Sequence, residues 1–191
     1  MPRWREGLQF PLVADGASLL TMLCCSAAFN ALAWSRHIWA LQLADHTGIL
    51  LLIAGTYSPF MAMACCPKIL GFVWTLALVS FTLKATRSRW DVEPVHVVCF
   101  LGMGWCVLAG WADVSASFTP WAQQMCILGG LLYTAGLVPW AANSFECHNA
   151  LWHVFVLAAS GCFFAVNILE IAQPANWHTN PAGTVGTCQR A

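Results

Sequence analysis

Apolar residues fall along the chain in long unbroken stretches, which are separated by charges, prolines and polar clusters. Runs such as "GILLLIAG" and "LALVSFTL" do not alternate with polar residues, which favours helices over the alternating strands of a membrane β-barrel. A helix needs about 20 apolar residues to cross a bilayer core about 30 Å thick. The pattern therefore predicts an all-α bundle of six transmembrane helices, at roughly 16–34, 46–65, 69–86, 94–112, 122–142 and 150–171.

Two segments outside these stretches are not expected to enter the membrane. Residues 1–15 form a short polar N-terminal segment with two arginines near its start. Residues 173–191 form a loose C-terminal tail that is rich in proline, glycine and polar side chains. Between them, residues 16–172 are expected to fold as a single transmembrane helical domain.

The composition excludes two large classes of function. Of the 191 residues, 59% are hydrophobic and 8% are charged, whereas soluble domains contain about 25% charged residues. So few charges cannot cover a water-facing surface, which excludes a soluble enzyme. Eight basic residues are balanced by eight acidic ones, so no nucleic-acid partner is expected. We expect an integral, multi-pass membrane protein whose partners include membrane lipids, and the composition does not specify the membrane.

A few polar side chains interrupt the predicted spans, where they are costly and indicate either function or interhelical hydrogen bonds. Six alternating spans place the end of the first, the start of the second and the start of the sixth on one side, which we call side Y. These three helix ends carry Ser26 and Asn30, Asp45 and His46, and Asn149 and His153. A shared polar site and simple hydrogen bonding between helices are both open interpretations. His96 opens the fourth span, and we expect its ring to contact interfacial water.

Three sequence motifs carry a resemblance to a known family. They are "ADHTGILLLIAGTYSPF" at 44–60, "GGLLYTAGLVPW" at 129–140 and "WHVFVLAASGCFFAV" at 152–166. Together they resemble the hemolysin III family, within the wider progestin and adipoQ receptor group. That family folds as a bundle of seven helices with a zinc site near the cytoplasmic face. The resemblance therefore implies that the six helices predicted here lack the counterpart of the family's first helix, and that side Y is cytoplasmic.

The resemblance also implies where metal ligands would lie. An S-x-x-x-H motif on the family's second helix supplies the first histidine ligand, and here it reads from Ser26 to Asn30. An H-x-x-x-H motif on the last helix supplies the other two, and here it reads from Asn149 to His153. Asparagine thus stands at two of three ligand positions, and only His153 matches.

Three further residues lie next to these positions in the resemblance. Asp45 matches an aspartate that contacts the metal through water. Ser26 and His46 would contact the ligand residues rather than the metal itself. His148 precedes Asn149, which turns it about 100° away on a regular helix. Zinc prefers imidazole and thiolate ligands to neutral amides. We therefore expect zinc, the one cofactor that the resemblance allows, to bind weakly or not at all.

Three functions are compatible with this sequence. The first is a non-catalytic membrane protein with a degraded zinc site, which acts through a lipid ligand or a protein partner. The second is a zinc-dependent lipid amide hydrolase, similar to ceramidases, which would work with an incomplete histidine site. The third is a pore-forming, hemolysin-like activity. The lost ligands favour the first function, and we assign no catalytic residue.

Overall fold

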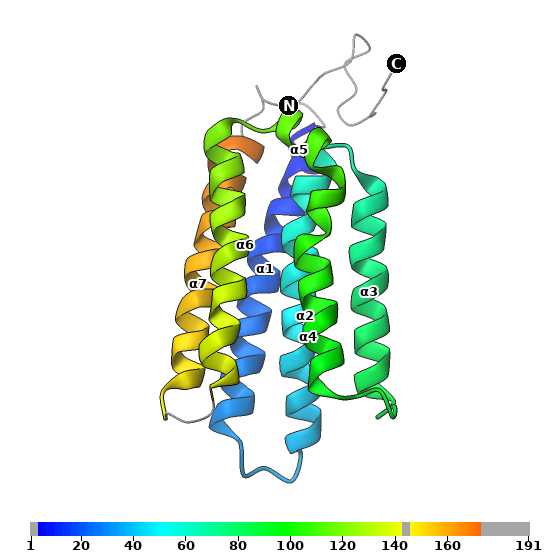
Figure 1. Cartoon of the computed structure of the whole chain (residues 1–191), viewed down its shortest axis with the longest axis vertical. Helices are drawn as coiled ribbons and strands as arrows, with labels where there is room; N and C mark the ends of the chain where they lie inside the picture. The colour runs from blue at the N-terminus through cyan, green and yellow to red at the C-terminus, as the bar shows by residue number, and fades with distance from the viewer. Residues whose placement is uncertain (1–3, 143–145, 173–191) are drawn as a thin grey trace.

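A computed structural model describes residues 4–142 and 146–172 of the chain. The described residues are helical apart from short connections (Figure 1). In chain order the elements are α1 (Trp4–Ala31), α2 (Ile38–Met63), α3 (Pro67–Ala85), α4 (Glu93–Trp105), the 3-10 turn η1 (Cys106–Gly110), α5 (Trp111–Ser117), α6 (Pro120–Ala141), α7 (His148–Val166) and the π-helical turn η2 (Asn167–Ile171).

Within the described residues, six helical segments are long and apolar enough to cross a membrane, which confirms the predicted all-α six-helix architecture. Elements α4, η1 and α5 together make one span, Glu93–Ser117, and α7 continues through η2 as another, His148–Ile171. The helices lie roughly side by side along the long axis of the molecule (Figure 1). Side Y is the lower end of the bundle in Figure 1. Helices α1 and α3 end there, and helices α4 and α7 begin there.

The first helix begins earlier than expected. We predicted a polar segment over 1–15 and a span from 16, but α1 is helical from Trp4 onward. Asp15, which we placed outside the membrane, is 6% exposed and belongs to the interior of the bundle. Its carboxylate accepts hydrogen bonds from two other helices, so the bundle accommodates it. The predicted tail over 173–191 lies outside the described residues.

Local sequence signals set several helix starts. Proline occupies the first turn of α3, α4 and α6, where its missing N–H costs no helical hydrogen bond. The hydroxyl of Thr119 caps α6 by accepting from the N–H of Ala122. Cys65 and Arg87 take positive φ values of 56° and 49° in the turns that follow α2 and α3. These residues begin the helices and form tight turns, so the connections between helices are short.

Close contacts at glycines hold the helices in two hairpins. A Cβ on Gly48 would lie 2.8 Å from the Cα of Met22, so α2 packs directly on the backbone of α1. A Cβ on Gly136 would lie 2.8 Å from the Cβ of Phe155, so α6 packs on α7 in the same way. Such contacts are typical of membrane helices, where association depends on packing. The two hairpins bring α1 and α7 together at side Y.

Candidate functional site

Two rows of hydrogen bonds join α1 to α7 at side Y. The Ser26 hydroxyl lies 3.0 Å from Nε2 of His153. One turn closer to the helix ends, Nδ2 of Asn149 donates to Oδ1 of Asn30 at 2.6 Å. Both pairs are four residues apart on their own helices, which places their side chains on one face. We call these four residues the α1–α7 ladder.

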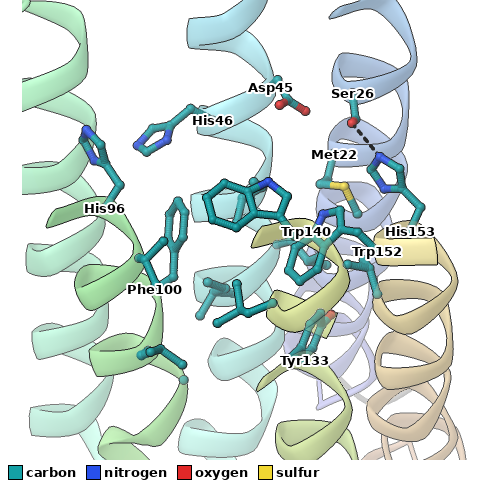
Figure 2. Close-up of a pocket in the computed structure, with 18 of the residues that line it drawn as sticks. Met22, Ser26, Asp45, His46, His96, Phe100, Tyr133, Trp140, Trp152 and His153 are labelled. Carbon is teal, nitrogen blue, oxygen red and sulfur yellow. Dashed lines mark hydrogen bonds between the residues drawn. The ribbon is translucent and has the colours of Figure 1, made fainter. Parts of the chain in front are cut away.

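Asp45 on α2 lies beside the ladder. Its carboxylate interacts with the hydroxyl of Ser26 and with the ring of His153. Figure 2 shows Asp45 close to Ser26, with its carboxylate near the hydrogen-bonded pair. The structure therefore brings together Ser26, Asn30, Asp45, Asn149 and His153 from three helices, at one depth of the bundle.

The donor atoms of this site do not fit a zinc ion of the family's type. Asn30 and Asn149 present neutral amides, and these amides bind each other. The Asn30 Nδ2 group also donates to the carbonyl of Ser26 at 2.8 Å. Within the part of the chain that the structure describes, no three His, Cys, Asp or Glu residues gather closely enough to hold a metal. Zinc needs imidazole, thiolate or carboxylate donors, so His153 and Asp45 supply too few.

The ring of His153 keeps one buried nitrogen without a partner. Nε2 is bonded to Ser26, whereas Nδ1 has no hydrogen-bond partner among the described residues. A buried polar atom in this state is costly unless a ligand or water satisfies it. His148, which we considered as a substitute ligand, is the first residue of α7 and lines the neighbouring cavity. The ladder therefore contains one ring nitrogen whose hydrogen-bonding capacity is unused within the described residues.

His46 lies in a different set of hydrogen bonds from its neighbour Asp45. Its Nε2 lies 3.1 Å from the hydroxyl of Ser80 on α3, and that hydroxyl lies 2.8 Å from Nδ1 of His96 on α4. Nε2 of His96 lies 2.9 Å from the Asp91 carboxylate, which also pairs with Lys84 at 3.3 Å. We call these five residues the His46–Lys84 chain. Figure 2 shows its two histidines, His46 and His96, across the bundle from Ser26 and His153.

Asp91 forms the outer end of this chain, in the connection between α3 and α4. Burial alone would raise the pKa of its carboxyl group. The hydrogen bond from His96 and the positive charge of Lys84 outweigh burial, so the pKa of Asp91 lies below its usual value. The His46–Lys84 chain thus ends in a charged group near the surface. Its middle is fully buried, since Ser80 is 0% exposed.

A cavity of about 610 Å³ lies between the ladder and the chain. Its polar wall includes Asp45 and His153, together with His46 and His96 opposite. Its remaining walls are mostly apolar and aromatic, with Met22, Ile49, Leu52, Ile53, Phe100, Trp140, Trp152 and Val156 among them. Polar groups at one end and apolar walls beyond are suited to an amphiphilic molecule.

Sequence reasoning missed several buried polar residues. His96, expected to contact interfacial water, is 3% exposed and is bonded through both ring nitrogens. Ser80, Asp15 and Asn167 are also buried. A serine or an asparagine within an apolar run is only weak evidence for a hydrogen bond between helices, since such residues often bond to their own helix. Only the register between helices reveals their partners.

Comparisons with known proteins agree on one family. The family model described as "Haemolysin-III related" matches residues 4–164. The "Hemolysin-3 homolog" of Bacillus subtilis (strain 168) is 30% identical over 154 residues, which cover 78% of this chain and 71% of that protein. The "Hemolysin-3" of Bacillus cereus is 26% identical over 153 residues, or 78% and 69% of the two chains. No solved structure matches the chain. The match of the family model and the six apolar helices identify the chain as a multi-pass integral membrane protein of the hemolysin III family.

Proposed function

We propose that this hemolysin III protein is non-catalytic and binds a single-chain lipid in its central cavity. The observation that carries the proposal is the cavity of about 610 Å³, which is polar at side Y and apolar further in. Cavities of about this size commonly hold small molecules. A lipid that enters from the surrounding membrane would meet both kinds of wall.

The length of the cavity suits an acyl chain. On α2 its lining runs from Gln42 to Tyr57, which corresponds to roughly 22 Å along the helix axis. The deeper part contains Leu52 and Val156, which are 3% and 2% exposed. An acyl chain buried there would gain about 0.8 kcal/mol for each methylene group. The apolar interior therefore supplies the affinity.

The polar end supplies the means to recognise a headgroup. Nδ1 of His153 has no hydrogen-bond partner among the described residues, and the carboxylate of Asp45 lies beside the same ring. A headgroup with hydroxyl or amide groups could donate to Asp45 and bond to His153 at once. The substitution of two ligand histidines by Asn30 and Asn149 supports a binding role rather than a metal-dependent hydrolase.

Lipid binding can be tested with a fluorescent fatty-acid analogue and the purified protein in detergent. Ile53→Trp places a larger side chain into the cavity wall. We expect it to weaken binding at least about tenfold, because the loss of apolar contacts and the added bulk together exceed 1.4 kcal/mol. Leu78→Trp is the matched control, since Leu78 is 64% exposed on the lipid-facing side of α3.

Equal affinities for the wild type, Ile53→Trp and Leu78→Trp would contradict the proposal. The zinc-dependent amide hydrolase makes a different prediction. The wild-type protein would then contain near-stoichiometric zinc by elemental mass spectrometry, and His153→Ala would lose it. Zinc at background in both proteins, together with cavity-dependent lipid binding, is the result that we expect.

A further inference from the structure

A second buried polar cluster lies in the half of the bundle away from side Y. At its centre is Asp15 on α1, which is 6% exposed. It lies eleven positions before Ser26, or about 16 Å along the helix axis. Among the side chains that the structure describes, no lysine, arginine or histidine forms an ion pair with its carboxylate. An ionisable group inside a membrane span without such a partner indicates a functional site.

Both oxygens of the Asp15 carboxylate accept hydrogen bonds from neutral donors on other helices. The hydroxyl of Thr56 on α2 donates to Oδ1 at 2.8 Å. The amide of Asn167, where η2 begins, donates to Oδ2 at 2.5 Å. A carboxylate that accepts from a donor at each oxygen is arranged as its charged form, because an ionised carboxylate is acceptor-only. In its ionised form the carboxylate would place one negative charge in the bundle interior.

Asn167 carries an unused oxygen atom at this cluster. Its side chain is 0% exposed, and its Oδ1 has no hydrogen-bond partner within the described part of the chain. The helix changes to π-helical geometry at this residue. Such distortions are frequent at functional sites, and interrupted membrane helices supply oxygen ligands to cations in transporters. As placed, Nδ2 faces the Asp15 carboxylate, and a turn of the amide about its own bond would bring the unpaired Oδ1 to that position instead.

At this level α2 packs directly on α1, and the Ser18 hydroxyl there donates to the backbone carbonyl of Asp15 at 2.7 Å. A Cβ on Gly55 would lie 2.5 Å from the hydroxyl of Ser18 and 3.5 Å from the carbonyl oxygen of Ala14. Gly55 therefore allows α2 to lie directly against these groups. Ser18 is itself 8% exposed. The cluster consists of oxygen donors from α1, α2 and η2, which are the ligands that hard cations prefer.

We propose that Asp15, Thr56 and Asn167 bind a sodium ion. One carboxylate balances one positive charge, whereas a divalent ion would leave an excess charge in a medium of low dielectric constant. To bind the ion, the Asn167 amide turns so that Oδ1 faces the carboxylate in place of Nδ2. Thr56 also lines the central cavity, which gives the ion a route to the cluster. Sodium then links α1, α2 and the end of α7.

The test is thermal unfolding of the purified full-length protein in detergent, in sodium, potassium or N-methylglucamine chloride at equal ionic strength. A ligand that binds only the folded state raises Tm in a saturable manner. We expect a saturable rise with sodium alone and its loss in Asp15→Asn. Glu93→Gln, at the exposed start of α4, is the matched acid-to-amide control and should retain the response.

Thr56→Val provides a second variant in case Asp15→Asn does not fold. It removes one oxygen ligand, and we expect the half-saturating sodium concentration to rise about tenfold, the effect of one lost polar contact. Three results would overturn the proposal. These are equal Tm values in all three salts, a sodium response that persists in Asp15→Asn, and a Tm that depends on pH but not on sodium. The last result would assign a proton to Asp15 instead.

Discussion

The α1–α7 ladder and the His46–Lys84 chain flank the same cavity, yet they use histidine in opposite ways. In the chain, His96 is bonded through both ring nitrogens, and Ser80 bridges it to His46. In the ladder, His153 is bonded through Nε2 only, and its Nδ1 is buried without a partner among the described residues. The His46–Lys84 chain links its histidines through Ser80, whereas the ladder leaves one ring nitrogen unused within the described residues.

This difference teaches that adjacency in sequence does not make two residues part of one site. Asp45 and His46 are consecutive, but successive residues on a helix point about 100° apart. Asp45 therefore faces α1 and α7, while His46 faces α3 and α4. Three experiments can break or sharpen this contrast.

Restoring histidine to the ladder should produce the largest effect. The double substitution Asn30→His with Asn149→His would place three imidazoles around the Asp45 side of the site. We expect bound zinc to rise from background to near one per protein, since complete zinc sites provide on the order of 10 kcal/mol. Elemental mass spectrometry of the purified protein measures the change. Each single variant is a control, and absence of zinc in the double variant would argue against this alignment of ligand positions.

Removal of the bridging hydroxyl should destabilise the His46–Lys84 chain. Ser80→Ala leaves Nε2 of His46 and Nδ1 of His96 without their common partner, in a position that is 0% exposed. We expect a loss of about 2 kcal/mol in the free energy of unfolding. Ser58→Ala is the matched control, because the Ser58 hydroxyl only donates to the Ala54 carbonyl of its own helix. Equal losses in both variants would mean that the chain is not a stabilising network.

The smallest expected effect is a loss of folding stability at acidic pH, which arises at Asp91, the outer end of the His46–Lys84 chain. The pKa of Asp91 is lower in the folded protein than its usual value, because the bond from His96 and the charge of Lys84 outweigh burial. Its contribution to stability is therefore present above the unfolded pKa, about 3.9, and is lost as pH falls through the folded pKa. Asp91 is partly exposed, so we expect at most about 1 kcal/mol.

Unfolding measured across acidic pH can detect this contribution. Asp91→Asn should remove the decline in stability that the wild type shows at the acidic end, while Glu93→Gln should leave it in place. An identical pH profile for the wild type and Asp91→Asn would show that the ion pair contributes nothing to stability.

The six spans could be predicted from sequence because continuous apolar runs of bilayer length have few alternative structures. The meeting of α1 and α7 could also be anticipated, since Ser26 and Asn30 share a face and the alternating topology brings their helix ends to side Y. The sequence did not indicate that the first helix begins before residue 16 or that Asp15 is buried, because an aspartate at this position resembles a boundary residue. Its burial depends on Thr56 and Asn167, which are 41 and 152 residues away.

The residues of the His46–Lys84 chain show a further limit of sequence reasoning. His96 was expected to contact water because it opens a span, but the turn after α3 places Asp91 and Lys84 over its ring. Interhelical register fixed these partners, and no local pattern in the chain encodes that register. Sequence therefore predicts which helix ends meet better than which side chains bond.

The α1–α7 ladder also has a consequence for biosynthesis. Ser26 and His153 are separated by 127 residues, so the hydrogen bonds of the ladder cannot form until the last helix has been made, although α2 already packs against α1. At typical rates of translation this interval lasts roughly ten seconds. During that time Ser26 and Asn30 face lipid, water or the insertion machinery. The closing of the ladder is therefore an event near the end of synthesis, and a chain truncated before α7 would expose unpaired polar groups that quality control can recognise.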